Sequence, residues 1–380
     1  MLRRAVRRTT RAAYQNISKP ILFLQHPDVV HRRLMRMAKT VQRIPGLRDA
    51  PMLWSHRSRR LEQEVAGITF KNPIGLSAGF DKNIEIPRMI QNIGFGFMIG
   101  GSITAQPCAG NPKPWFYRLP KSKSLVVHAG LPNDGAQAIV ERLKRQSTRQ
   151  FDDFPLSVSV AKTNTPECAT DEQAIADYCQ SLALLEKHAV CQLYEINISC
   201  PNTFGGEPFT TPARLESLLS AVDALRLSKP LFVKMPISIP WREFRELLEI
   251  VVTHNVQGVT IGNLLKGRAR ANLSEDLPVS VMGGLSGAPT RDISTELIRR
   301  TYETHGDRLV IIGVGGVFSA SDAYEKIKAG ASLVGLITGL IFEGPQLVGE
   351  INVGLEKLLK KDGHASIADA VGSDVTQKRV

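Results

Sequence analysis

Eight short apolar runs follow one another along the chain, and segments with helical patterning separate them. Strands that alternate with helices need right-handed crossovers, so this order predicts a parallel sheet covered by helices. Eight such repeats favour a closed (β/α)8 TIM barrel, with a doubly wound open sheet as the alternative. The expected strands are Pro73–Phe80, Gly96–Ile103, Leu156–Lys162, Leu193–Ser199, Leu231–Pro236, Gly258–Asn263, Leu309–Gly316 and Leu333–Gly339. The expected helices include Asp171–His188, Pro212–Leu227, Trp241–Asn255 and Ser321–Ala329.

The length of 380 residues fits one such barrel with additions at its ends. We expect a small helical extension over residues 1–65, a barrel over residues 66–365 and a flexible tail over residues 366–380. The hydrophobic share of 43% and the charged share of 22% are those of an ordinary globular protein with a large core.

The net charge of +12 is concentrated at the N-terminus. Residues 1–60 contain 15 Lys or Arg and two acids, Asp28 and Asp49, whereas the other 320 residues carry 33 bases and 34 acids. An anionic partner is therefore expected at this segment. Residues 1–13 are basic, hydroxylated and free of acids, which is typical of a mitochondrial presequence and also of a helix on a membrane surface.

A helix is expected to begin near Asp28. Val30, Leu34, Met37 and Val41 fall on one face of it, and five cations line the other face. This pattern predicts an amphipathic helix that lies on anionic lipid, with a surface helix packed on the main domain as the alternative. No aromatic residues interleave the charges as a stacking platform would require, so no nucleic acid is expected as a partner.

The five cysteines are an odd number without a CxxC pair or ligand-like spacing to histidine. Neither a disulfide framework nor a metal site is expected, and a reducing compartment is indicated. No apolar run approaches the roughly 18 residues that a membrane span needs, so the chain is not expected to cross a bilayer.

Polar residues and glycines gather where the expected strands end, which is where a TIM barrel builds its active site. Glycine-rich loops follow the seventh and eighth runs, at Gly313–Gly316 and at Thr338-Gly339. Barrels commonly hold a phosphate there, through backbone N–H groups and a helix N-terminus. Since no dinucleotide fingerprint follows the first strand, these loops predict a phosphorylated cofactor such as FMN.

Several of these segments together resemble the dihydroorotate dehydrogenases over about residues 20–350. The motifs that carry the resemblance are Pro73–Asn83, Gly110–Pro114, Asn197–Asn202, Gly283–Gly287 and Ile312–Gly316. The N-terminal extension resembles that of the class 2, quinone-reducing branch, which implies that residues 1–65 dock on the membrane and guide the quinone toward the flavin. The resemblance implies oxidation of (S)-dihydroorotate to orotate in pyrimidine biosynthesis, with a hydride passed to FMN and electrons to a membrane quinone.

The resemblance also implies roles for individual residues. Lys82 would face the substrate carboxylate, and Asn197, Asn202 and Asn263 would bond the pyrimidine, since amides offer both donors and an acceptor. Asn133 and His128 are further candidates for substrate binding. Lys234 would lie at the flavin ring and stabilise negative charge that forms on reduction. The expected cofactor contacts are Ala78, Gly79, Ser102, Ser159, Asn197, Lys234, Gly262, Gly283, Gly284, Gly287, Gly315, Gly316, Thr338 and Gly339.

Cys200 takes the position of the catalytic base in this family. Class 2 members usually carry serine there, and class 1 members carry cysteine. A thiol, with a reference pKa of about 8.5, is a far better base near neutral pH than a hydroxyl.

Other positions depart from the class 2 pattern. Val127 and Pro132 replace two substrate-binding asparagines, and Gly262 and Leu264 stand where threonines are usual. His128 could replace a lost amide. Two alternatives therefore remain: an FMN enzyme of this fold that acts on another heterocycle or uses a soluble acceptor such as fumarate, and a non-catalytic flavin-binding protein. The expected location is the cytoplasmic face of a bacterial inner membrane, with the mitochondrial inner membrane as the alternative.

Overall fold

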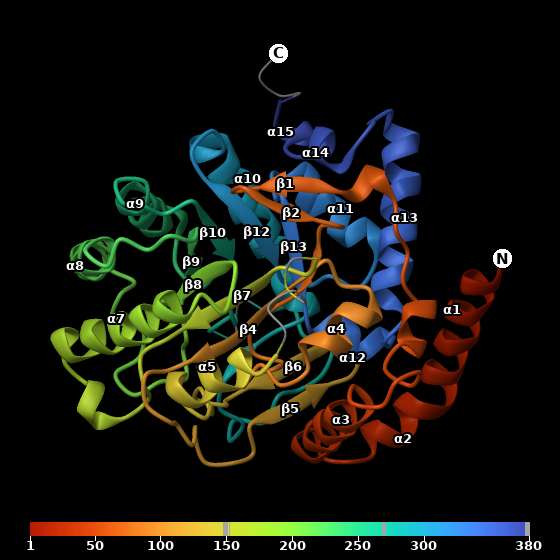
Figure 1. The fold of residues 1–380 in the computed structure, drawn as a ribbon, viewed down its shortest axis with the longest axis horizontal. Helices are drawn as coiled ribbons and strands as arrows, with labels where there is room; N and C mark the ends of the chain where they lie inside the picture. The colour runs from red at the N-terminus through yellow and green to blue at the C-terminus, as the bar shows by residue number, and fades with distance from the viewer. Residues whose placement is uncertain (147–150, 152, 268–270, 377–380) are drawn as a thin grey trace.

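The computed structural model describes residues 1–146, 151, 153–267 and 271–376. Within these residues, eight parallel strands close into a barrel that the helices surround (Figure 1). Each expected run contains one of these strands, so the prediction of a (β/α)8 barrel is confirmed. The barrel strands are β3 (Ile74–Leu76), β4 (Phe97–Ile103), β7 (Leu156–Val160), β8 (Leu193–Asn197), β9 (Leu231–Met235), β10 (Gly258–Ile261), β12 (Val310–Val314) and β13 (Leu333–Leu336).

The end of the barrel at which the strands begin is filled by large aromatic side chains and covered by a hairpin. The hairpin consists of β1 (Gln63–Val65) and β2 (Ile68–Phe70), and Phe70 packs edge-on against Phe97 at the start of β4. Gly258 leaves room for the neighbouring Phe232, because a Cβ at Gly258 would lie 1.8 Å from that ring. The mouth of the barrel is at the opposite end, where the C-terminal ends of the strands lie.

The outer helices cover the barrel, and their ends follow local capping signals. One expected helix, α7, spans Asp171–His188 as predicted, and Thr170 and Gln173 form a capping box at its start. The predicted C-terminal ends of α8 and α9 lie four residues beyond those in the structure. The helices around the barrel are α4 (Pro87–Ile93), α5 (Ala136–Lys144), α7, α8 (Pro212–Asp223), α9 (Trp241–Val251), α10 (Arg291–His305), α11 (Ala320–Lys328), α12 (Thr338–Glu343) and α13 (Leu347–Asp362).

A small antiparallel sheet stands beside the mouth of the barrel. It contains β5 (Phe116–Leu119), β6 (Ser124–Val127) and β11 (Gly284–Leu285), with β6 in the middle. The pairing of β6 with β11 joins a segment before β7 to a segment after β10, so two distant loops form one wall of the mouth.

The N-terminal extension lies against one side of the barrel (Figure 1). It consists of α1 (Leu2–Ala13), a π-helical turn (Tyr14–Ser18), α2 (Lys19–Phe23) and α3 (Pro27–Val41). The predicted helix near Asp28 is therefore confirmed.

Polar contacts hold α1 on the segment that leads into the barrel and α3 on the small sheet beside the mouth. In α1, the buried guanidinium of Arg7 donates to the carbonyl oxygens of Trp54 and Ser55 at 3.2 and 3.3 Å. At the start of α3, the Asp28 carboxylate accepts the backbone N–H groups of Trp115 and Phe116 at 3.0 and 3.1 Å. These contacts hold α3 across the mouth, next to β5.

The C-terminal segment packs on the barrel over the part that is described. Short helices α14 (Ile367–Ala370) and α15 (Ser373–Thr376) follow α13, and Ile367 and Ala370 are fully buried. The remainder of the expected tail, residues 377–380, lies outside the described residues. No described helix combines the length and hydropathy that crossing a membrane requires.

Candidate active site

The C-terminal ends of the barrel strands surround a hollow, which we call the mouth cavity. It reaches from the strand ends to the inner face of α3. Its polar lining includes Lys82, Ser102, Asn197, Cys200, Asn202, Lys234 and Asn263. Its apolar lining includes Val30, Leu34, Phe116, Leu131, Leu264 and Ile341. Polar side chains from the strand ends and apolar side chains from α3 and the neighbouring loops thus line one space.

A second hollow opens beside it between the loops after β12 and β13, and we call it the glycine-loop cavity. The two cavities share Lys234, Asn263 and Thr338, so they are continuous. A Cβ at Gly339 would lie 2.0 Å from the carbonyl oxygen of Val317, so only glycine fits there. Of the expected cofactor contacts, this cavity is lined by Ala78, Lys234, Gly262, Gly287, Gly315, Gly316, Thr338 and Gly339.

Cys200 lies in the loop that follows β8, and its side chain lines the mouth cavity. Burial raises the pKa of the thiol, while the backbone N–H of Asn202 and the ammonium groups of Lys234 and Lys162 act in the opposite direction. The thiol form therefore predominates at neutral pH in the ligand-free site.

The loop that carries Cys200 is fastened from the barrel side. The ammonium of the buried Lys162 donates to the carbonyl oxygen of Phe204 at 2.7 Å, and the side-chain oxygen of Asn164 accepts the N–H of Phe204 at 2.5 Å. The hydroxyl of Thr203 donates to the carbonyl oxygen of Gly206 at 2.7 Å. Three contacts thus position one turn of backbone.

Two amides meet at the bottom of the mouth cavity. The Nδ2 of Asn263 donates to the Oδ1 of Asn197 at 3.1 Å, and the Nδ2 of Asn197 donates to the hydroxyl of Ser102 at 2.8 Å. Ser159 stands behind Ser102, with 2.9 Å between the two hydroxyl oxygens, and does not line either cavity. The Nδ2 of Asn263 also donates to the carbonyl oxygen of Ser199 at 2.7 Å, and its Oδ1 accepts the N–H of Leu264 at 2.9 Å. These bonds fix the orientation of both amides at the bottom of the cavity.

Two lysines supply positive charge to the site. Lys82 donates to the carbonyl oxygen of Gly79 at 2.7 Å and lies over the ring of Phe116; burial lowers the pKa of its ammonium to about 8. Lys234 projects from β9 and is only 6% exposed. Among the described residues its ammonium has no hydrogen-bond acceptor, although it borders both cavities. A buried ammonium in this state attracts an anionic or electron-rich ligand.

Asn202 closes the side of the mouth cavity that faces β6. Its Nδ2 donates to the carbonyl oxygen of Val127 at 2.9 Å, and its Oδ1 lies 3.3 Å from the Nδ1 of His128. Asn111 donates to the carbonyl oxygen of Asn202 at 2.9 Å and lies 3.3 Å from the Nε2 of the same His128. His128 therefore stands behind Asn202 and orients it.

Three further expected contacts lie away from both cavities. The side chain of Asn133 is buried and bonds Thr104, where its Oδ1 accepts the backbone N–H and its Nδ2 donates to the hydroxyl, so it shapes a turn. Gly283 and Gly284 belong to the wall formed by β11 and β6, where Gly284 pairs with Val127. Sequence position alone had grouped these residues with the cavity lining.

Several residues of the mouth cavity were missed by the sequence analysis. His31 on α3 packs edge-on against Phe80 and Phe116, and burial together with Lys82 lowers its pKa to about 3, so it is neutral. Arg118 on β5 donates to the carbonyl oxygens of Phe23 and Gln25 at 3.3 and 2.6 Å. The apolar face of α3, which was expected to meet the membrane and to guide a quinone, was the only signal near His31, and no sequence signal marked Arg118.

The departures from the class 2 pattern are distributed unevenly. Val127 and Leu264 line the mouth cavity, where they make the wall near Asn202 and Asn263 apolar. Pro132 does not line it. The fourth departure, Gly262, lines the glycine-loop cavity, so three of the four substitutions can affect what binds.

Comparison with known proteins agrees with the geometry. The family model described as "Dihydroorotate dehydrogenase" matches residues 60–359. A curated relative named dihydroorotate dehydrogenase (quinone) from Haloarcula marismortui is 37% identical over 95% of this chain and 99% of its own length. A relative of the same name from a Cyanothece species is 34% identical over 92% of this chain and 96% of its own length.

Solved structures resemble the fold over nearly the same extent. The ligand-free dihydroorotate dehydrogenase of Eimeria tenella has a TM-score of 0.80 and 27% identity, covering 92% of this chain and 99% of that one. The structure of the Eimeria tenella enzyme in complex with ferulenol has a TM-score of 0.77 and 27% identity, covering 92% of this chain and 95% of that one.

Proposed function

The chain belongs to the dihydroorotate dehydrogenase family, and we propose that it is a quinone-dependent member that oxidises (S)-dihydroorotate to orotate in pyrimidine biosynthesis. The observation that carries this proposal is the mouth cavity itself. Cys200, Lys82 and Lys234 line one continuous space that also reaches the apolar inner face of α3. Substrate oxidation at the strand ends and binding of a lipid-soluble electron acceptor beside α3 can therefore take place in the same cavity.

Enzymes of this family are flavin-dependent, and the two cavities fit FMN. Lys234 offers a buried ammonium without an acceptor, and the buried hydroxyl of Ser77 in the glycine-loop cavity has no partner among the described residues. The cradle around Gly315 and Gly339 suits a phosphate and its backbone contacts. When bound, FMN accepts the hydride that leaves the substrate. We assign its ring to Ala78, Gly79, Ser102 and Lys234, and its phosphate end to Gly262, Gly287, Gly315, Gly316, Thr338 and Gly339.

The residues of the mouth cavity divide the work on the substrate. Lys82 pairs with the carboxylate, while Asn197, Asn202 and Asn263 present amide donors and acceptors to the ring. The thiolate of Cys200 takes the proton from the carbon next to the one that loses the hydride, which leaves a carbon–carbon double bond. The positive charge of Lys234 stabilises the negative charge that develops nearby.

The α3 end of the cavity fits a quinone. Val30, Leu34 and Ile341 provide an apolar wall, and the neutral His31 and the guanidinium of Arg118 are the polar groups there. A quinone needs an apolar surround and a few polar partners for its carbonyl oxygens. A soluble acceptor such as fumarate, with two carboxylates, matches this wall poorly.

The extension also carries the features of a membrane-docking surface. Its exposed apolar side chains include Ile17, Ile21, Leu24, Leu34 and Met37. Beside them, a basic hollow between α3, α4 and α5 contains one acid, Glu85, and is lined by Lys39, Arg43, Arg48, Arg88, Arg142 and Arg145. Apolar insertion flanked by cations binds anionic lipid. We assign residues 1–65 to this role and place the protein at the cytoplasmic face of a bacterial inner membrane.

Anaerobic mixing of the purified protein with dihydroorotate tests the proposal. Bleaching of the flavin absorbance by dihydroorotate, and its return after addition of a quinone, is the expected result. Val127 and Leu264 favour a second candidate, an FMN enzyme that acts on a less polar heterocycle. That candidate predicts a flavin that stays oxidised with dihydroorotate and bleaches with the other substrate.

A further inference from the structure

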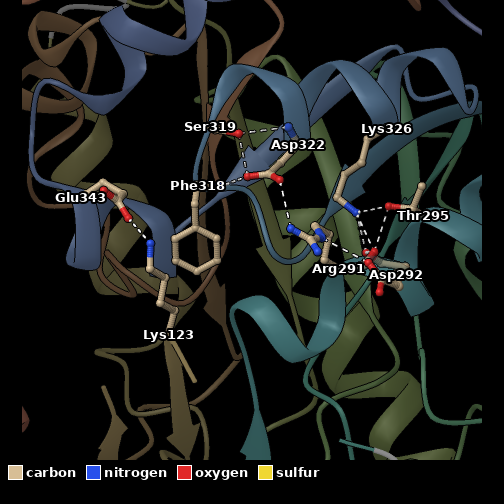
Figure 2. Close-up of polar contacts among 10 residues, drawn as sticks. Lys123, Arg291, Asp292, Thr295, Phe318, Ser319, Asp322, Lys326 and Glu343 are labelled. Carbon is tan, nitrogen blue, oxygen red and sulfur yellow. Dashed lines mark hydrogen bonds and ion pairs between the residues drawn. The ribbon is translucent and has the colours of Figure 1, made fainter. Parts of the chain in front are cut away.

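A lysine outside the mouth cavity is completely buried. Lys326 on α11 is 0% exposed, and its ammonium donates to the hydroxyls of Ser294 and Thr295 at 2.6 and 2.9 Å and to the carbonyl oxygen of Arg291 at 3.3 Å (Figure 2). All three acceptors are uncharged and belong to the first turns of α10. No step of the proposed reaction uses this group.

The acceptors of Lys326 lie directly behind the glycine-loop cavity. A Cβ at Gly315 would lie 3.0 Å from the hydroxyl oxygen of Ser294, so one hydroxyl separates the ammonium from that glycine. Gly316 packs in the same way against the backbone of Arg291. Apart from Lys234, the lining of this cavity contains no lysine or arginine.

A neighbouring carboxylate on the same helix is engaged elsewhere. Asp322 forms an ion pair with Arg291 at 3.2 Å and accepts the backbone N–H of Phe318 at 2.9 Å, as Figure 2 shows. This pairing ties the end of the glycine loop to α10 and leaves Lys326 without a direct counter-ion among the described residues. The site thus holds an unneutralised positive charge under a loop that is built for a phosphate.

We propose that Lys326 is a positioning residue whose positive charge, acting from behind the glycine loop, favours a phosphate in the glycine-loop cavity. Binding of a flavin phosphate is then coupled to protonation of this buried amine. The proposal rests on the proposed flavin site and assigns a role in cofactor binding to a residue that lies behind that site. A phosphate held by the Gly315 loop would be separated from the ammonium by the Gly315 backbone and the Ser294 hydroxyl, and charges at such short range interact strongly in a protein interior.

The charges around Lys326 set the direction of this coupling. Burial lowers the pKa of Lys326 to about 7, against opposing contributions from Glu325, Asp322 and Asp292 and a like-charge contribution from Arg291. Strands β12 and β13 carry no charged residue, and the charges facing α11 from α13 and α15 act on its other side chains: Asp362 on Tyr324, and Asp374 on Lys328.

The sign of the pH dependence follows. A bound dianion raises the pKa of the amine, so binding takes up a proton wherever the free protein has lost it. Affinity for FMN is therefore highest below about pH 7 and falls as the pH rises above it, by at most about tenfold per pH unit. The phosphate itself is already a dianion in that range, because its second pKa is about 6.

The test compares FMN with riboflavin, which has the same ring but no phosphate. Dissociation constants of the apoprotein are measured by quenching of flavin fluorescence between about pH 7 and 9. We expect FMN affinity to fall with pH in the wild type and riboflavin affinity to stay level. Lys326→Met should bind FMN more weakly at pH 7 and remove the pH dependence, and Lys326→Arg should bind tightly throughout.

Lys328→Met is the matched control, because it removes one charge from the same helix at a partly exposed site paired with Asp374. It should behave as the wild type does. If Lys326→Met does not fold, proton uptake by the wild type is measured calorimetrically in two buffers at about pH 8; uptake with FMN and none with riboflavin supports the coupling.

Two outcomes overturn the proposal. Equal pH dependence for FMN and riboflavin assigns the titration to the ring end, where Lys82 lies. FMN binding that keeps its pH dependence in Lys326→Met excludes Lys326. A protein that binds neither flavin contradicts the proposed cofactor instead, so the two failures are distinguishable.

Discussion

The ammonium of Lys162 donates a hydrogen bond of 2.7 Å to the carbonyl oxygen of Phe204, four residues beyond Cys200. Lys162 is buried at the end of β7, and burial lowers the pKa of its ammonium. A rigid strand end thus holds the loop on which the proposed base depends. Position of a catalytic group within a fraction of an ångström is worth orders of magnitude in rate.

Lys162→Met should therefore loosen the loop without removing the base. A hydrogen bond from a charged donor contributes about 1.5–3 kcal/mol, so we expect flavin reduction by dihydroorotate to slow by about tenfold to a hundredfold. Retention of FMN should be unchanged. Lys144→Met, at an exposed lysine paired with Glu141, is the control. Wild-type reduction rates in Lys162→Met would mean that the loop needs no such support.

Lys82 makes substrate binding depend on pH. Its pKa is lowered to about 8, and the charged form is needed to pair with a carboxylate. Affinity for the product orotate should consequently fall as the pH rises through about 8. Perturbation of the flavin spectrum by orotate measures this affinity directly. Lys82→Met should bind orotate weakly at every pH, and an unaltered titration in that variant would assign the carboxylate to another cation.

Cys200→Ser changes the pKa of the proposed base while a side chain of similar size stays at the same position. The pKa of the thiol is raised by burial, so flavin reduction in the wild type should accelerate as the pH rises and the thiolate forms. A serine hydroxyl is a weaker acid still, and the variant should retain some activity with its pH profile displaced to higher pH. Rapid-mixing measurements of flavin reduction across pH give both profiles. Superimposable profiles would show that a group other than residue 200 titrates.

The extension should serve the quinone and the membrane, and not the oxidation of the substrate. Leu34→Glu and Met37→Glu place carboxylates on an exposed apolar face, and anionic lipid attracts the extension through cations worth about 1 kcal/mol each. Both variants should bind anionic vesicles weakly and turn over quinone slowly, with dihydroorotate still reducing the flavin at the wild-type rate. Val279→Glu, also highly exposed but far along the chain, is the control. Full vesicle binding by both variants would contradict membrane docking.

Much of the barrel was predictable because its signals are local. Parallel strands are buried on both faces, so each of the eight appears as a continuous apolar run, and α7 carries its own capping box. Because barrel sites form at the C-terminal strand ends, Lys82, Cys200 and Asn263 were expected to lie together, and all three line the mouth cavity.

What could not be predicted depends on contacts between distant segments. His31 and Phe116 meet only because Asp28 fixes α3 to β5, and the sequence of neither segment predicts this contact. Asn133 lies in a motif that predicts substrate binding, yet its amide donates a hydrogen bond to the hydroxyl of Thr104 within a turn. The burial of Lys326 likewise arises from the packing of α11 on α10, where an amphipathic pattern would have placed a lysine in solvent.

We propose that Cys200 removes the proton as dihydroorotate reduces the bound flavin. Single-turnover flavin reduction in Cys200→Ala, measured anaerobically beside the wild type with equal FMN content, tests it most directly. We predict that the variant binds FMN and orotate normally and reduces its flavin about 10²- to 10⁴-fold more slowly. Reduction at the wild-type rate with normal FMN content would contradict the claim.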